Sequence, residues 1–199
     1  MKIQKNSRQM PKTKEITSQK QYSDIIYGYL QTNSTYDERT GVRMVDKHAA
    51  MKTHIAAAFN ITRQTVATKI NKLKELGLIE ETPNGIKLIE IPANKAFLIP
   101  FNTMRKLTSA FNENAISIYV YLFNRYIANG EKGFDFTATQ LKTFCGLGTN
   151  THSNNYIIED ILHVLAAAGL IKFSQITRSK NGVITTCYEL SYIGFFSEV

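Results

Sequence analysis

The sequence has few cysteines and no long apolar run. Its 199 residues include two cysteines, Cys145 and Cys187. Neither lies at zinc-site spacing from another cysteine or a histidine, so we expect buried, reduced thiols and no metal site. No apolar run approaches the ~20 residues that a membrane helix needs, so we expect no membrane partner. The N-terminus shows no apolar signal segment, and a cytoplasmic protein is therefore expected.

Sequence motifs of enzymes are also missing. No glycine-rich phosphate loop with a following lysine is present, and Gly146-Leu147-Gly148 is too short to count as one. There is no nucleophile elbow, and the carboxylates are scattered without apparent pairing. We therefore expect no enzymatic activity, no catalytic residues and no cofactor.

Positive charge is concentrated in the first half of the chain. The net charge is +8 at pH 7. Residues 1–91 hold 15 Lys and Arg against 9 acids, whereas residues 92–199 hold 9 against 7. This asymmetry favours a polyanionic partner for the first half.

The segment 60–79 carries the clearest structural pattern. Thr62 is expected to cap a helix over 62–76, and Gly77 suits the left-handed position that ends a helix. Three aliphatic residues recur on one face of this helix: Val66, Ile70 and Leu73. A strand then begins, and Pro83-Asn84-Gly85 is typical of a hairpin turn. This order is that of the DNA-reading half of a winged helix-turn-helix.

A second copy of this pattern follows at an offset of 92 residues. The stretch Gly77-Leu78-Ile79 matches Gly169-Leu170-Ile171. The inward helical positions of the first copy match Ile158, Leu162 and Leu165. The chain is therefore predicted to repeat one fold.

We predict an α+β fold, mainly α-helical with small β-hairpins, made of two winged helix-turn-helix modules in tandem. The first module is expected over 21–92 and the second over 114–199. Residues 1–20 are predicted to form a flexible basic arm. Residues 93–113 are predicted to be a connector with some order of its own, in which 97–100 could form a strand or pack between the modules.

Some boundaries inside the first module can also be predicted. Residues 32–40 form a polar stretch, and 42–45 are expected to form a short strand. Asp46 is a plausible N-cap for the helix before the turn at Asn60.

The outward face of helix 62–76 offers the groups that a major-groove reader needs. It carries amide, hydroxyl and basic side chains: Arg63, Gln64, Thr65, Thr68, Lys69, Asn71 and Lys72. Amides pair with adenine, arginine with guanine, and lysine with phosphate. Base contacts are expected mainly from the N-terminal turns. An ordinary polar helix surface is the alternative interpretation.

Further contacts are predicted outside this helix. Lys52 and His54 lie on the preceding helix, where phosphate contact is expected, and neither His54 nor His48 has convincing metal partners. The first hairpin carries Glu80 and Glu81, which disfavour deep DNA contact, with Lys87 as the local cation.

Two features of the second module bear on its partner. Arg178 and Lys180 are placed at the tip of the second hairpin, where they suit phosphate contact, with a solvated turn as the alternative. The segment 149–156 is polar and nearly uncharged, so it fits either DNA or a protein. Aromatic residues on helix 115–127 suit packing, dimerisation or another partner.

The stretch NITRQTVATKINKLKELGLI resembles winged-helix transcription regulators. The second half, from FLIPFNTMRKL through AISIYVYLFNRYIANG to ILHVLAAAGLI, resembles the N-terminal winged-helix domain of plasmid and phage replication initiators of low-GC Gram-positive bacteria, including the DnaD-like and RepA-like groups. These resemblances imply a DNA-binding protein.

Three functions follow as expectations. The first is a sequence-specific double-stranded DNA-binding protein that regulates transcription on a mobile element. The second is a replication initiator or replisome organiser that binds an origin. The third is a winged-helix protein-interaction module, such as a phage inhibitor, which would show no salt-dependent DNA affinity. A homodimer or a replication or transcription partner is compatible with the first two.

Overall fold

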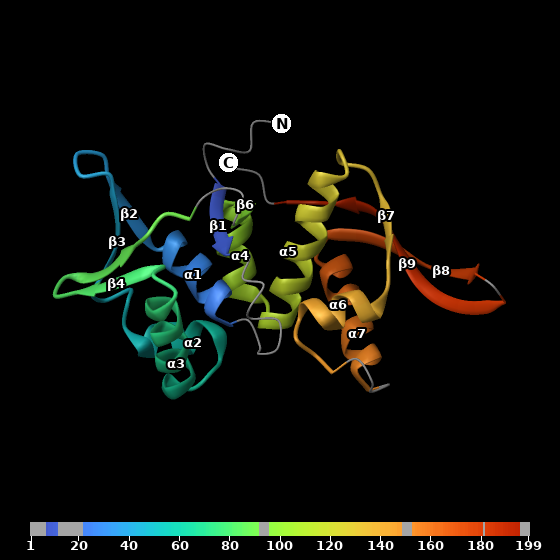
Figure 1. Cartoon of the computed structure of the whole chain (residues 1–199), viewed down its shortest axis with the longest axis horizontal. Coiled ribbons are helices and arrows are strands. Elements are labelled where there is room, and N and C mark those ends of the chain that lie inside the picture. Colours follow the sequence, from blue (N-terminus) through green and yellow to red (C-terminus); the bar gives the residue numbers. More distant parts are fainter. Residues whose placement is uncertain (1–6, 12–21, 92–95, 149–152, 181, 196–199) are drawn as a thin grey trace. The chain divides into compact units, whose positions relative to one another are not determined.

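The computed structural model describes residues 7–11, 22–91, 96–148, 153–180 and 182–195 (Figure 1). Over these ranges the fold is α+β, with helices and antiparallel sheets. The chain forms two compact units. The first unit is centred on Tyr22–Glu113 and includes the N-terminal strand, and the second is centred on Asn114–Phe195. None of the helices in the described ranges has the length and apolarity of a transmembrane segment.

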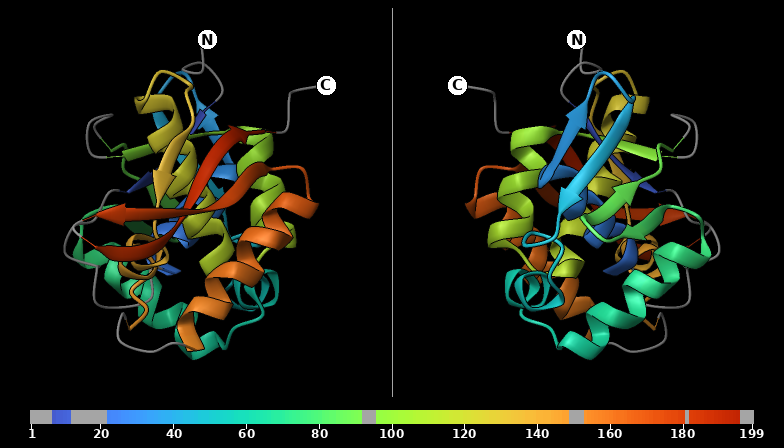
Figure 2. Two further views of the ribbon diagram at one scale, coloured as in Figure 1. Left: turned by 90° about the vertical axis from the view of Figure 1, so that its right-hand side faces the viewer. Right: turned by 90° about the vertical axis from the view of Figure 1, so that its left-hand side faces the viewer.

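The first unit combines four helices with two sheets. Its helices are α1 (Tyr22–Thr32), α2 (Lys52–Phe59), α3 (Arg63–Glu75) and α4 (Phe101–Ala110). Its strands are β1 (Ser7–Pro11), β2 (Ser34–Asp37), β3 (Val42–Asp46), β4 (Ile79–Thr82), β5 (Gly85–Leu88) and β6 (Ala96–Pro100). Four of these strands form an antiparallel sheet in the order β2-β3-β5-β4, visible in the right-hand view of Figure 2.

The core of the first unit lies between α1, α2, α3 and one face of the four-stranded sheet. The helices bury aliphatic side chains there, among them Ile26, Leu30, Ile55, Val66, Ile70 and Leu73. Because side chains alternate along a strand, cross-strand neighbours share a face. Val45 of β3 and Ile86 of β5 are such a pair, and both are buried.

The second unit repeats this order of elements. It contains α5 (Glu113–Ala128), β7 (Phe134–Phe136), α6 (Ala138–Phe144), α7 (Ser153–Ala167), β8 (Ile171–Lys180) and β9 (Val183–Ile193). The sheet order β7-β9-β8 corresponds to β3-β5-β4 of the first unit. The β8–β9 hairpin is much longer than its counterpart, as the left-hand view of Figure 2 shows.

The two units end their third helices in the same way. Gly77 has φ +67° and Gly169 has φ +72°, so both take the left-handed conformation predicted for them. The Leu78 N–H donates to the Leu73 carbonyl oxygen at 2.9 Å. The Leu170 N–H makes the equivalent bond to Leu165 at 3.0 Å. The offset of 92 therefore holds in the backbone as well as in the sequence.

The segments around the first unit differ from the prediction. Within the expected arm, Ser7–Pro11 form a strand that pairs antiparallel with β6; the other residues of that arm lie outside the described ranges. Within the expected connector, β6 and α4 belong to the first unit. The physical reason is burial, because Ile99, Met104 and Leu107 are fully buried. A connector over 93–113 was thus the wrong prediction for these residues.

The predicted helix cap at Asp46 was also wrong, and the polar stretch before β3 contains a further strand. Asp46 accepts hydrogen bonds from the backbone N–H groups of His48, at 2.8 Å, and Ala49, at 3.0 Å, so it caps a turn before α2. The helix itself begins after Met51, which makes no side-chain cap. The polar stretch contains β2, which pairs with β3 through a turn in which Asp37 accepts from the Arg39 N–H at 2.9 Å.

Candidate nucleic-acid interface

A three-residue turn sets the start of α3. Asn60 ends α2 with φ +50°, and the Ile61 N–H donates to the Ala56 carbonyl oxygen at 3.0 Å. Thr62 then caps α3, as predicted, since its hydroxyl oxygen accepts from the Thr65 N–H at 3.1 Å. Both sides of the turn are fixed by hydrogen bonds, so the direction of α3 relative to α2 is well determined.

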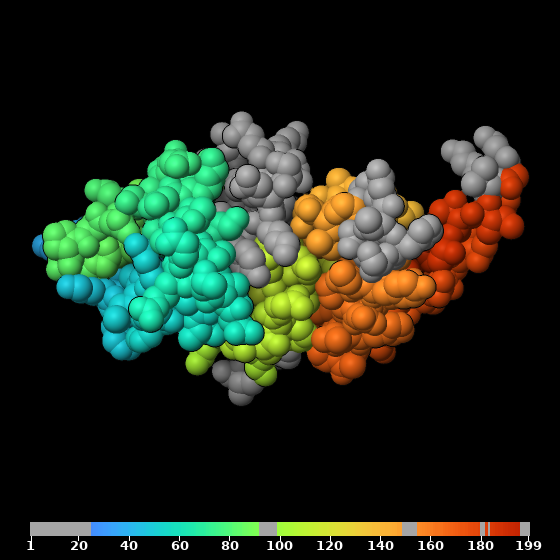
Figure 3. All heavy atoms as spheres, turned by 90° about the horizontal axis from the view of Figure 1, so that it is seen from below, coloured from blue at the N-terminus to red at the C-terminus, as the bar shows by residue number. Residues whose placement is uncertain are grey.

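The predicted outward face of α3 is at the surface of the first unit (Figure 3, teal). Its inward positions are buried as expected from the helical period. The exposed side chains of the predicted reading face are Arg63, Gln64, Thr68, Asn71 and Lys72, while Thr65 and Lys69 are half-buried. The structure thus brings the predicted residues of this helix onto one accessible surface.

The threonine hydroxyls of this face are engaged within the helix. The Thr65 Oγ1 atom lies 2.9 Å from Thr62 Oγ1. The Thr68 hydroxyl donates to the Gln64 carbonyl oxygen at 3.1 Å. A base or phosphate would have to compete with these bonds, so the guanidinium of Arg63 and the amides of Gln64 and Asn71 are better placed for direct contact.

Ion pairs offset the acids of the first hairpin. Lys87 Nζ lies 3.1 Å from Glu80, and Lys74 Nζ of α3 lies 2.7 Å from Glu81. Exposed pairs of this kind contribute little stability, about 0–1 kcal/mol. Their effect here is on the surface potential, because each carboxylate has a cation beside it. Lys87 is therefore not the sole local cation, and the sequence interpretation overlooked Lys74.

Lys52 and His54 lie near the start of α2. Lys52 is exposed and His54 is half-buried. The His54 ring contacts the His48 ring edge-to-face, with centroids 4.2 Å apart. Sequence reasoning missed this contact because the two histidines lie on different segments. In the parts of the chain that the structure describes, no three metal-binding side chains form a group.

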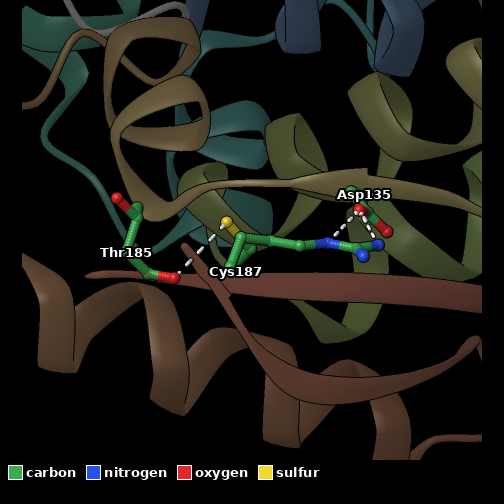
Figure 4. Close-up of polar contacts among 4 residues, drawn as sticks. Asp135, Thr185 and Cys187 are labelled. Carbon is green, nitrogen blue, oxygen red and sulfur yellow. Dashed lines mark hydrogen bonds and ion pairs between the residues drawn. The ribbon is translucent and has the colours of Figure 1, made fainter. Parts of the chain in front are cut away.

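In the second unit, Arg178 is held by a carboxylate. Its Nε donates to Asp135 of β7 at 3.0 Å, and this partner raises the pKa of the guanidinium (Figure 4). Arg178 was predicted at the tip of the hairpin. It lies instead further along β8, opposite Thr185. Lys180 is the last residue of β8 and lies opposite Val183. The structure therefore directs Arg178 across the sheet and away from the tip.

The remaining predictions for the second unit concern its thiols and its third helix. Cys145 and Cys187 are both buried free thiols, as predicted. The Cys187 Sγ donates to the Thr185 carbonyl oxygen at 3.9 Å (Figure 4). Residues 149–152 of the predicted polar segment lie outside the described residues, and α7 begins at Ser153.

A basic and aromatic pair on the β2–β3 hairpin was not predicted. The Arg43 guanidinium lies 5.2 Å from the centre of the Tyr36 ring, and Tyr36 is 54% exposed. The signal for this hairpin was present in the turn-forming residues from Asp37 to Gly41, which has φ +67°.

Comparisons with known proteins identify no family for this chain. No protein-family model and no curated protein matches the chain.

Proposed function

We propose that the chain is a sequence-specific double-stranded DNA-binding protein made of two winged helix-turn-helix modules. In this proposal each unit is one module, and α3 of the first unit enters the major groove. The element order supports it, because a helix, a strand, two helices and a hairpin follow one another in both units, with β2 as an additional strand in the first. A short turn between two helices is typical of DNA-reading helix pairs.

The outward surface of α3 is the observation that carries the proposal. It combines one guanidinium, two amides and two ammonium groups on a helix whose opposite face is fully buried. Four basic residues stand against one acid on this helix, Glu75, which lies 3.4 Å from Lys72. Such a surface offers both base-edge contacts and neutralisation of phosphates.

Each side chain has a role in this proposal. Arg63 donates two hydrogen bonds to a guanine, and Gln64 and Asn71 pair with adenines. Lys69 and Lys72 bind phosphates. Lys52 binds the backbone from the start of α2.

The proposed biological role is transcription regulation on a phage or plasmid. Its support is the resemblance of residues 60–79 to winged-helix regulators. The bound site would then lie in a promoter. A site that lies in an origin would instead identify a replication initiator.

The experiment is enrichment of DNA sites from a random library, followed by titration at several salt concentrations. Arg63→Ala is expected to relax base choice at one position and to cost about 1–3 kcal/mol of specific binding. Lys72→Ala is expected to weaken binding to all sequences alike and to reduce the salt slope by about 0.9. Arg105→Ala is the control, since Arg105 is an exposed arginine of α4, outside the proposed interface.

The outcomes separate the alternatives. If Arg63→Ala and Lys72→Ala both match the wild type while DNA still binds, α3 is not the reading helix. If the protein shows no salt-dependent affinity for any duplex, the proposal is wrong and the units are interaction modules.

A further inference from the structure

The face of α7 that corresponds to the proposed reading face has a different chemistry. At the offset of 92, six positions on the outward side of α3 have counterparts on α7. These counterparts are Tyr156, Ile157, Asp160, His163, Val164 and Ala167. All six are exposed. The six α3 positions carry two amides, two hydroxyls, one ammonium group and one carboxylate. On α7 they are replaced by one phenol, three aliphatic side chains, one carboxylate and one imidazole.

This makes α7 apolar on two opposite sides. Its inward side buries Ile158, Leu162 and Leu165. On its outward side, Tyr156 is 69% exposed, Val164 54% and Ile157 40%. Exposed apolar groups gathered on one surface mark an interaction site. The helix contains no Lys or Arg, so phosphate contact does not explain this surface.

Two contacts between α7 and the sheet show which polar groups belong to the outward face. Glu159 accepts a hydrogen bond from the Tyr188 hydroxyl at 2.7 Å and is thereby turned toward the sheet. The His163 ring lies against Phe173 of β8, with centroids 5.4 Å apart. Asp160 is thus the carboxylate of the face, and His163 is held beside it, one turn further along the helix.

Four of these residues form a stripe that is complementary to itself. Tyr156, Asp160, His163 and Ala167 are spaced by four, three and four residues, which is the spacing of a helix-pairing seam. Consider two antiparallel copies of α7 related by a two-fold axis that passes between Ile161 and Leu162. Each tyrosine then faces the small alanine of the other copy, and each aspartate faces the histidine of the other copy.

We propose that α7 pairs antiparallel with α7 of a second copy of this chain. The large and small residues match in size, and the Asp160 carboxylate can accept a hydrogen bond from the His163 imidazole of the other copy. A two-fold interface uses the same patch on both subunits, which this stripe permits. Ile157 and Val164 lie along one side of the seam and add apolar contact.

The pairing would give the DNA-binding protein two copies of α3. Dimeric readers bind two half-sites, and their sites repeat with two-fold symmetry. This use of the dimer rests on the proposed function, whereas the pairing of α7 does not.

The test is sedimentation equilibrium of the full chain in the absence of DNA. The wild type is expected to form dimers at micromolar concentrations. His163→Asp places two carboxylates against each other and is expected to weaken dimerisation about tenfold or more. The double variant Asp160→His with His163→Asp exchanges the pair and is expected to restore most of the loss. Ala167→Tyr is expected to block pairing through steric conflict with Tyr156.

The matched control is Asn71→Asp, which changes the α3 position that corresponds to His163. It is expected to lower DNA affinity and to leave the dimer unchanged. Circular dichroism identifies any variant that fails to fold, and Ala167→Tyr and the charge exchange probe the same seam independently.

Three results would overturn the proposal: a monomeric wild type, a dimer that neither His163→Asp nor Ala167→Tyr weakens, or a charge exchange that restores nothing. Because dimerisation is measured without DNA, these results are distinct from a failure of DNA binding.

Discussion

At the scale of the residue, Gly85 lies where β5 passes close to β3. It has φ +139°, and a Cβ there would overlap the Val45 carbonyl oxygen and lie 2.9 Å from the Asp46 carbonyl carbon. Backbone atoms cannot move away as a flexible side chain can. The hairpin between β4 and β5 therefore requires glycine at this position.

Gly85→Ala is expected to destabilise the first unit by more than about 2 kcal/mol, since strain and overpacking add. The measurement is urea unfolding. Gly77→Ala is the control, because Gly77 has φ +67° with open space around its Cβ position. That change is expected to cost only the left-handed strain, about 1–2 kcal/mol. Equal losses for the two variants would contradict the close approach of β3.

The ion pair of Arg178 and Asp135 decides how much charge the second hairpin offers. Asp135→Asn is expected to release the guanidinium and, if β8–β9 contacts DNA, to steepen the salt dependence by about 0.9. Stability should change by no more than about 1 kcal/mol, because the pair is exposed. Glu131→Gln removes the same charge from an exposed position in the same unit and serves as the control. An unchanged salt slope for Asp135→Asn would exclude Arg178 from the interface.

Long-range partners of this kind could not be predicted from the sequence. Asp135 and Arg178 are 43 residues apart in the sequence. Their side chains meet because β7 and β8 both pair with β9, one on each side. Lys74 and Glu81 likewise meet across the helix end and the hairpin. By contrast, the Thr62 cap is a local interaction over three residues and follows directly from the sequence.

At the scale of the element, α4 is a packed helix of the first unit that was not predicted. It follows Pro100, has no side-chain cap, and buries Thr103, Met104, Leu107 and Thr108 on one side. Those positions have the spacing of one helical face, which indicates a packed helix and not a connector. The pairing of β6 with β1 was not predicted, because the partners are far apart in the sequence. Arg8 and Ile99, for example, are separated by 91 positions.

Met104→Ala is expected to destabilise the first unit by about 2–5 kcal/mol, the usual cost of truncating a buried methionine. Its side chain lies against Gly28 of α1, so the cavity would open between two helices. Arg105→Ala, at the exposed neighbouring position, is expected to change stability by no more than about 0.5 kcal/mol. Denaturant unfolding of both variants provides the comparison. Similarly small losses of stability for both variants would contradict the packing of α4 in the core of the first unit.

At the scale of the whole molecule, buried phenols make both units sensitive to alkali. Burial raises the pKa of Tyr27 from 10.0 to about 12. Burial also raises the pKa of Tyr119, whose hydroxyl donates to the Gly194 carbonyl oxygen, and that of Tyr188. The folded state of each unit therefore holds protons that the unfolded chain releases at lower pH.

Below pH 10, the ionisation of these phenols is expected to leave the free energy of unfolding independent of pH. As the pH rises from 10 toward 12, the free energy of unfolding is expected to fall, because the unfolded state then binds fewer protons than the folded state. Urea midpoints measured along this range, together with phenolate absorbance, provide the measurement. Tyr27→Phe should reduce the loss of stability at alkaline pH. If all ten tyrosines of the folded protein ionise together near their ordinary pKa, this result would contradict the burial of these phenols.

The matching helix ends at Gly77 and Gly169 have a consequence for how the chain can change over time. Each unit keeps its third helix in place with buried aliphatic residues and a glycine, none of which is on the outer face. Mutations on that outer face therefore carry little folding penalty. The third helices of the two units can therefore offer different contacts while their backbones end in the same way.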